Sequence, residues 1–150
     1  MDLFRRLYGT MAITTTVYQE VCHAGAPSAL RDFFASPPSW LRILPDVLPY
    51  LEETRVLDPG EASTITLAWQ YRDSCLVIMD EKRGRSISVA LGLRITGVAG
   101  ILTDASAAGM IDFEMVFHRL SLTRFHLASS LVEVLRQRYL TVASVIETKE

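Results

Sequence analysis

The sequence has few cysteines, little net charge and no long apolar run, and each of these features limits the class of protein. Its two cysteines, Cys22 and Cys75, are far apart and lack metal-ligand spacing, so they indicate free buried thiols in a reducing compartment. The net charge of −2 provides no general basic field that would attract nucleic acid. No apolar run approaches the ~20 residues of a transmembrane helix, and no long apolar region follows residues 1–6 as in a signal peptide. We therefore expect a cytoplasmic protein without a membrane segment.

Several catalytic and binding motifs are missing as well. The sequence contains no Gly-rich phosphate loop, no Gly-x-Ser-x-Gly elbow and no Cys/His pairing pattern. The three histidines, His23, His118 and His126, share no spacing, so we expect neither a metal site nor a catalytic base among them. No basic recognition helix is evident, which argues against a transcriptional regulator.

The chain does have the composition of one globular domain. It contains 150 residues, of which 49% are hydrophobic and 21% are charged, which is enough for a core and argues against disorder. No repeat, linker or low-complexity segment divides it. We predict a single domain over residues 1–150, with a core over residues 1–138 and a tail over residues 139–150.

The most informative stretch opens with the start of a helix. Asp58 occupies the position of an N-cap, Pro59 that of the first helical residue, and Glu61 the third position of a capping box. These residues predict a helix over residues 59–71. Glu61 has two alternative roles here, because it can complete the cap or it can share a cation with Asp80.

The same stretch continues into a strand that is followed by two acids. The apolar run over residues 75–79 predicts a strand buried on both faces. Asp80 and Glu81 follow at its carboxyl end, where ligands bind in open α/β sheets. Hard cations such as Mg²⁺ and Mn²⁺ prefer carboxylate oxygens and water. The alternatives are that Asp80 is a turn residue and that Glu81 favours the N-terminus of the next helix.

Basic and aromatic residues near these acids also have two interpretations. Lys82, Arg83 and Arg85 could bind RNA phosphates, although Arg85 could equally pair with Asp80 or Glu61 and orient it. Two tryptophans could stack on bases, but one of them, Trp69, lies in an amphipathic helix and is expected in the core.

Along the whole chain, strands alternate with helices, which indicates an α/β fold with a parallel sheet. Thr15 or Thr16 is expected to cap a helix that contains Glu20 and ends near Gly25, and Ser28 to cap the next, over residues 28–34. The other expected helices cover residues 2–8, 45–53, 59–71, 84–91, 98–108, 113–120 and 128–138, and the strands cover residues 11–14, 40–44, 75–79 and 93–96. Gly9 and Gly109 are expected to end the helices before them, and Asp112 to cap the helix after it.

Four segments together resemble the PIN domain family, in particular its branch of toxin-type ribonucleases from toxin–antitoxin operons. The resemblance runs from about Met1 to Leu135, and the order and spacing of the segments carry it. The segments are Val17-Tyr18-Gln19-Glu20-Val21, Leu57-Asp58-Pro59-Gly60-Glu61-Ala62, Ile78-Met79-Asp80-Glu81 with Arg85, and Leu91-Gly92-Leu93 with Thr96-Gly97.

The resemblance implies a PIN-like three-layer α/β fold with a short central parallel sheet and C-terminal helices. It also implies an endoribonuclease that uses Mg²⁺ or Mn²⁺. Glu20, Glu61 and Asp80 match the acidic positions of the family, with Glu81 as an auxiliary acid or as an alternative to Asp80. From its own surroundings, Glu20 could equally be a solvated helix residue. An antitoxin and a second copy of the chain are the implied partners, and the apolar helices between Phe113 and Leu135 would suit a dimer face.

The sequence departs from the family pattern before its first helix. The resemblance implies a hydrophobic strand that ends in a metal-binding Asp and precedes residues 2–8, and the given chain has no such strand. Either the true start codon lies upstream or the chain is an N-terminally truncated variant. We expect impaired or absent nuclease activity in the 150-residue chain, which cleavage assays with the strand restored would test. The alternative is a non-catalytic interaction protein that keeps the PIN fold.

Overall fold

A computed structural model describes residues 2–122 of the chain, so the helix expected over residues 128–138 and the tail over 139–150 lie outside the described part. The described chain falls into two compact units, Met1–Thr96 and the unit that begins at Gly97. The first unit holds all the strands of the described part, and the expectation of a single domain stays a prediction.

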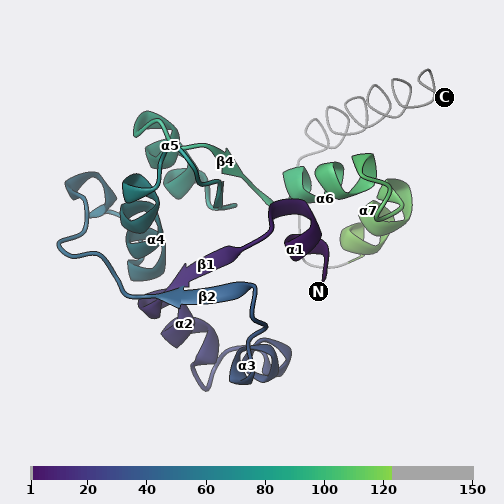
Figure 1. The fold of residues 1–150 in the computed structure, drawn as a ribbon, viewed down its shortest axis with the longest axis horizontal. Helices are drawn as coiled ribbons and strands as arrows, with labels where there is room; N and C mark the ends of the chain where they lie inside the picture. The colour runs from purple at the N-terminus through teal and green to yellow at the C-terminus, as the bar shows by residue number, and fades with distance from the viewer. Residues whose placement is uncertain (1, 123–150) are drawn as a thin grey trace. The chain divides into compact units, whose positions relative to one another are not determined.

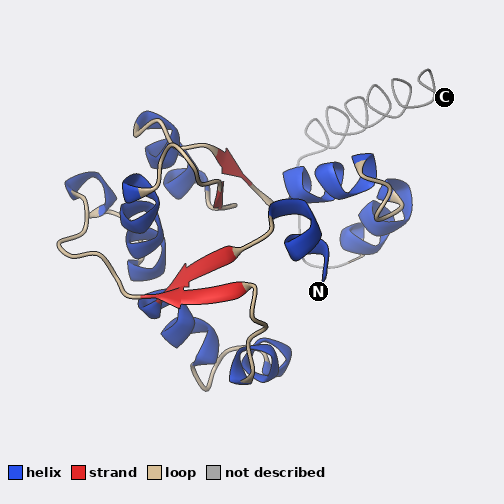
Figure 2. Ribbon diagram, viewed as in Figure 1, coloured by secondary structure: helices blue, strands red, loops and turns tan. Residues whose placement is uncertain are grey.

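The first unit is an α/β structure in which short strands and helices alternate (Figures 1 and 2). This confirms the α/β class and the parallel strand direction that the sequence predicts. In chain order its elements are α1 (Asp2–Tyr8), β1 (Met11–Thr14), α2 (Thr15–Cys22), α3 (Ser28–Ala35), β2 (Leu41–Leu44), a 3₁₀ turn (Glu52–Thr54), α4 (Pro59–Gln70), β3 (Val77–Ile78), α5 (Lys82–Ala90) and β4 (Ile95–Thr96).

The strands form two separate parallel pairs in place of one continuous central sheet. β1 pairs with β2, with Met11 opposite Leu41, and the two arrows run side by side in the same direction in Figure 2. β3 pairs with β4, with Val77 opposite Ile95. Among the described residues no hydrogen-bonded strand links the two pairs.

Helix α4 supplies the centre of the hydrophobic core of this unit. Its residue Ile65 is fully buried and packs with Val77 and Met79 of the β3 segment and with Leu93 before β4. Fully burying one such aliphatic side chain contributes about 1.5–3 kcal/mol. Trp69, on the same helix, packs against this cluster and is covered by the Arg72 guanidinium 4.7 Å from the ring centre, which confirms its expected place at the core.

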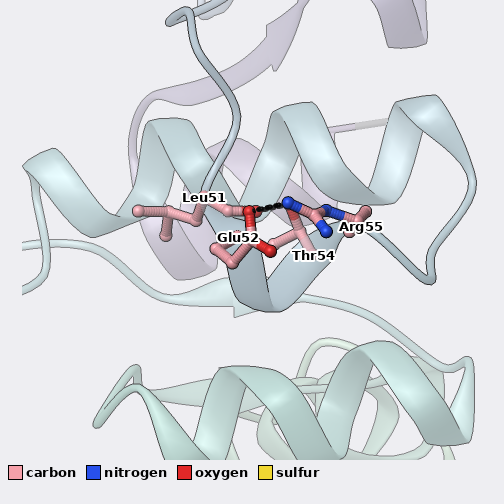
Figure 3. Close-up of polar contacts among 4 residues, drawn as sticks. All are labelled: Leu51, Glu52, Thr54 and Arg55. Atoms are coloured by element: carbon pink, nitrogen blue, oxygen red, sulfur yellow. Dashed lines mark hydrogen bonds and ion pairs between the residues drawn. The ribbon is translucent and has the colours of Figure 1, made fainter.

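The segment over residues 45–53 was predicted as a helix, and this prediction is wrong. The chain from Pro45 runs without helical structure through a cis Leu48–Pro49 bond, and only the turn Glu52–Thr54 is helical. Proline removes an N–H donor that a helix needs. The Asp46 carboxylate also accepts hydrogen bonds from Thr16 and Tyr50, so it does not cap a helix here. Figure 3 shows the turn, in which Arg55 pairs with Glu52; both side chains are exposed, so this ion pair contributes little.

Helix ends differ from the predictions by one or two residues. Thr14, and neither Thr15 nor Thr16, caps α2, because its hydroxyl accepts a hydrogen bond from the Val17 N–H. Pro27 precedes the first residue of α3 in place of the expected Ser28 cap. Gly9, with φ of 75°, ends α1 as predicted, because this left-handed conformation favours glycine.

The second unit is helical within its described residues. α6 (Val98–Ala107) buries Ala99, Ile101 and Ala105, and α7 (Phe113–Ser121) begins where the Asp112 carboxylate accepts a hydrogen bond from the Met115 N–H at 2.9 Å. This is the cap that the sequence predicts at Asp112. The expected dimer face lies largely outside the described residues and stays a prediction.

Candidate acidic active site

The site is built where the strands of the first unit end and the following helices begin. β1 leads directly into α2, and β3 leads through Asp80 and Glu81 into α5. The end of β1 is joined to α4 by a buried hydrogen bond of 2.8 Å between the hydroxyls of Thr14 and Ser63. The contact brings acids from distant parts of the sequence to the carboxyl ends of parallel strands, which is where α/β proteins bind ligands.

Glu20 lies in the last half of α2 and reaches the first turn of α4. Its carboxylate accepts a hydrogen bond of 3.0 Å from the backbone N–H of Gly60. A Cβ at Gly60 would overlap this carboxylate, so only glycine leaves room for it. Glu20 therefore supplies a free helix N-terminus with an acceptor, and its negative charge interacts favourably with the helix dipole.

Glu61 lies in the first turn of α4, half-buried, and its carboxylate packs against α5. A Cβ at Gly84 would overlap the Met79 Sδ atom and would lie 3.1 Å from the Glu61 Oε1 atom, so this glycine makes room for the Met79 side chain and leaves space beside the carboxylate. The predicted capping box forms only in part, because the Asp58 side chain makes no cap hydrogen bond, whereas the Asp58 backbone hydrogen-bonds to the Glu61 carboxylate.

The electrostatic surroundings of Glu61 are those of a crowded acidic site. Burial raises the pKa of the Glu61 carboxyl above its ordinary value, and the hydrogen bond to the Asp58 backbone lowers it. The negative charges of Glu81, Asp58 and Glu20 raise this pKa further, and the raising effects prevail. Glu61 is thus surrounded by three other acids that disfavour its charged form.

The charges of Glu20, Glu81 and Asp58 thus act on the Glu61 carboxyl. The assignment of Glu20, Glu61 and Glu81 as metal ligands stays a prediction. Glu81 is exposed at the N-cap position of α5. Asp80 is exposed between β3 and α5, and its charge is not among those that raise the pKa of Glu61. The assignment of Asp80 as a ligand stays a prediction.

The three basic residues beside the acids differ in their contacts. Lys82 and Arg83 are exposed in the first turn of α5, where Arg83 also donates a hydrogen bond of 3.4 Å to the Val56 carbonyl. Arg85 is half-buried and donates a hydrogen bond of 2.7 Å to the Met79 carbonyl. Arg85 thus braces the end of β3, next to Asp80.

One acid at this edge escaped the sequence analysis. Asp46 follows β2, and its carboxylate accepts hydrogen bonds from the Thr16 N–H at 3.1 Å, from the Thr16 hydroxyl and from the Tyr50 hydroxyl at 2.9 Å. Burial raises the pKa of Asp46, but these hydrogen bonds and one to the Thr15 backbone outweigh it and hold the pKa below its ordinary value. The sequence signal for this residue is an acid two residues after a strand, but the same position is also typical of a helix start, as in the helix predicted over residues 45–53.

The donor chemistry of the site fits a hard divalent cation held by few protein ligands. Within residues 2–122, no three Asp, Glu, His or Cys side chains lie close enough to enclose a metal ion. Mg²⁺, however, is usually held by one or two carboxylates and keeps several waters. The charges that raise the pKa of Glu61 are of the kind that a bound cation offsets, and the assignment of a metal ligand set here stays a prediction.

The fold and the site define an α/β protein with clustered acids at the carboxyl ends of its strands. A model of the PIN domain family matches residues 1–139, so the chain belongs to the PIN domain family. PIN domains are in general nucleases that use divalent metal ions and bind RNA. Neither the search of curated proteins nor that of solved structures found a match. No helix in the described part of the chain has the length and apolarity needed to cross a membrane.

Proposed function

We propose that the chain is a PIN-type endoribonuclease that depends on Mg²⁺ or Mn²⁺ and acts as the toxin of a toxin–antitoxin pair. Glu20, Glu61 and Asp80 are the proposed ligands and catalytic acids, with Glu81 as an auxiliary ligand. One observation carries the proposal: Glu61 is half-buried at the carboxyl edge among the charges of Glu81, Asp58 and Glu20, and its pKa is raised. Carboxyls whose pKa is shifted by burial and by neighbouring charges cluster at functional sites.

In the proposed mechanism, each group of residues has a separate task. A bound Mg²⁺ or Mn²⁺ ion would polarise a phosphoryl oxygen and supply hydroxide from water at neutral pH. Glu20, Glu61 and Asp80 would hold the ion, with Glu81 as an auxiliary ligand, and the N–H of Gly60 fixes the Glu20 carboxylate at the start of α4. Lys82 and Arg83, exposed at the start of α5, would bind the RNA backbone. Arg85 keeps the end of β3 in place through the Met79 carbonyl.

The decisive experiment titrates Mn²⁺ into the purified chain by calorimetry and assays Mn²⁺-dependent cleavage of single-stranded RNA. Asp80→Asn and Glu61→Gln are expected to weaken Mn²⁺ binding at least about tenfold, because site affinity follows the number of anionic ligands. Asp32→Asn is the matched control, because Asp32 is an exposed acid of α3. Equal binding by Asp80→Asn and the unaltered chain would remove Asp80 from the site, and no binding by the unaltered chain would contradict the metal-dependent mechanism.

A specific observation also favours the second candidate, a non-catalytic interaction protein with the PIN fold. The Glu20 carboxylate already serves the N-terminus of α4, and within the described residues no three ligand side chains enclose an ion. If the chain binds an antitoxin yet neither binds Mn²⁺ nor cuts RNA, this candidate replaces the nuclease. Light scattering of the chain alone would test the proposed homodimer.

A further inference from the structure

We propose that the cavity between the 3₁₀ turn and the first turn of α4 binds a guanine base of the RNA substrate. The cavity has a volume of about 280 Å³, just below the range of ~300–1,000 Å³ found for sites that take drug-sized ligands. It therefore suits one flat ring system better than a whole nucleotide. The inference rests on the proposed function only in that RNA delivers the base, because none of the proposed metal ligands lines the cavity.

The first argument is that the cavity shares the first turn of α4 with the acidic site. Pro59 and Ala62 line the cavity from this turn. The two residues between them in the sequence belong to the acidic site, because the Gly60 N–H holds the Glu20 carboxylate and Glu61 is the half-buried acid. A substrate that lies over the acids therefore passes the cavity.

The second argument is that a basic side chain borders the same cavity. Arg83 donates a hydrogen bond of 3.4 Å to the carbonyl of Val56, which directly precedes the lining residue Leu57. Arg83 and its neighbour Lys82 are the proposed contacts of the RNA backbone. Unstacked bases of single-stranded RNA can be splayed out into protein pockets. A phosphate held by Arg83 thus leaves a nearby base free to enter the cavity.

The third argument is that the walls of the cavity suit an aromatic ring. Leu51, Leu57 and Ala62 provide apolar wall, and Tyr50 adds an aromatic ring. This ring is half-buried, and its hydroxyl donates a hydrogen bond of 2.9 Å to the Asp46 carboxylate, which fixes its position. Bases stack on aromatic side chains in proteins that bind single-stranded nucleic acid. A fixed ring loses little further freedom when a base binds.

The fourth argument selects guanine among the bases. Glu52 and Arg55 also line the cavity, and their side chains lie next to each other as an exposed ion pair (Figure 3). Guanine carries two donors, at N1 and N2, beside two acceptors, O6 and N7. The Glu52 carboxylate can accept from the donors while the Arg55 guanidinium donates to the acceptors. Adenine has an amino donor in place of O6 and no donor at N1, so it does not match this pair.

The test titrates guanosine, inosine, adenosine and uridine 5′-monophosphates into the full chain and follows binding by NMR. A chelator is present, so that metal binding does not contribute. We expect the guanosine nucleotide to bind about tenfold or more tightly than the adenosine nucleotide, which is the discrimination typical of a bidentate contact to a base. The inosine nucleotide lacks the N2 amino group and should have an intermediate affinity.

Two variants and a contact measurement locate the base. Glu52→Ala and Arg55→Ala are each expected to abolish most of the preference for guanosine over adenosine, and both residues are exposed, so the fold should persist. Glu53→Ala is the matched control, because Glu53 is an exposed acid of the same turn that does not line the cavity. Nuclear Overhauser effects should connect the guanine H8 proton with the Tyr50 ring and the Ala62 methyl group.

Three outcomes would overturn the inference: equal or absent binding of the guanosine and adenosine nucleotides, a preference that survives Glu52→Ala, and contacts of the base away from the cavity. Any of them can occur while the chain still binds Mn²⁺ and cuts RNA, which would leave the proposed function in place. Selective guanosine binding by a chain that neither binds Mn²⁺ nor cuts RNA would support the base site and contradict the nuclease.

Discussion

Glu61 is the residue whose ionisation most directly connects stability with the proposed chemistry. Its folded-state pKa lies above its ordinary value because of burial and the charges of three neighbouring acids. Ionised Glu61 therefore costs folding free energy. The cost is absent below the pKa of the unfolded chain, grows as the pH rises through the folded-state pKa and is complete above it.

Replacing Glu61 with Gln is therefore expected to stabilise the metal-free chain at neutral pH while it weakens Mn²⁺ binding. The gain is about 1 kcal/mol or less, because the site is partly exposed and solvent screens the charges. Urea unfolding between about pH 4 and about pH 8 covers the titration of a Glu with a raised pKa. Over this range the ionisation of Glu61 should lower the free energy of unfolding of the unaltered chain, and Glu61→Gln should lack that loss. Glu53→Gln, at an exposed acid of the 3₁₀ turn, is the control. A neutral-pH loss of stability in Glu61→Gln would contradict the electrostatic account.

Asp46 has the opposite linkage between protonation and stability. Its pKa is lowered by hydrogen bonds from Thr16 and Tyr50, so its contribution is present above its unfolded-state pKa and is lost as the pH falls through the folded-state value. Asp46→Ala is expected to cost about 1.5–3 kcal/mol at neutral pH, the range for hydrogen bonds to a charged group. At acid pH, below the folded-state pKa of Asp46, the difference in stability between Asp46→Ala and the unaltered chain should shrink. Thermal unfolding at neutral and at acid pH measures this difference, with Asp32→Ala as the control. An equal loss of stability at the two pH values would show that the charge of Asp46 is unimportant.

At the scale of elements, the contact between α2 and α4 depends on Gly60 having no side chain. Gly60 is a poor helix residue, yet its missing Cβ is what allows the Glu20 carboxylate to reach the first turn of α4. The two residues are therefore coupled, and the coupling can be measured.

A double-mutant cycle on Gly60 and Glu20 provides the measurement. Gly60→Ala alone is expected to destabilise the chain, because the new methyl group displaces the Glu20 carboxylate from the Gly60 N–H. In the Glu20→Ala background the same change should stabilise the chain by up to about 1 kcal/mol, the difference in helix propensity between the two residues. Equal effects of Gly60→Ala in both backgrounds, measured by urea unfolding, would argue against the contact.

The short strands depend on their neighbours more than on their own composition. β3 is confined to Val77–Ile78, although residues 75–79 are all apolar. Its length is set by where β4 can pair with it, because a ladder residue needs an opposite strand.

At the scale of the whole molecule, the net charge of −2 limits how RNA can be bound. Without a general basic field, attraction rests on local contacts such as those of Lys82 and Arg83. Two to three phosphate contacts to single-stranded RNA predict a slope of log K against log salt of about −1.4 to −2. Anisotropy titrations over a range of salt concentrations test this, and Lys82→Ala with Arg83→Ala should reduce the slope by about 1.4. A slope unchanged in the double variant would place the RNA elsewhere on the chain.

The sequence alone determined the local features and, through the order of four segments, the family. The caps and stops at Gly9, Asp112 and Gly109 follow from short-range chemistry, and so do most helices, since a periodic apolar pattern and a turn residue act within a few positions. The match of the PIN family model to residues 1–139 confirms the resemblance that those segments carried.

The tertiary structure alone decided which distant groups meet. It divided the strands into two pairs, directed Glu20 to Gly60, surrounded Glu61 with other acids and used Asp46 as an acceptor, so that residues 45–53 did not form a helix. The contact of Glu20 with Gly60 joins residues 40 positions apart, and that of Asp46 with Thr16 joins residues 30 positions apart. Burial, charge repulsion and hydrogen bonding act through space, and no local pattern records which partner the fold will supply.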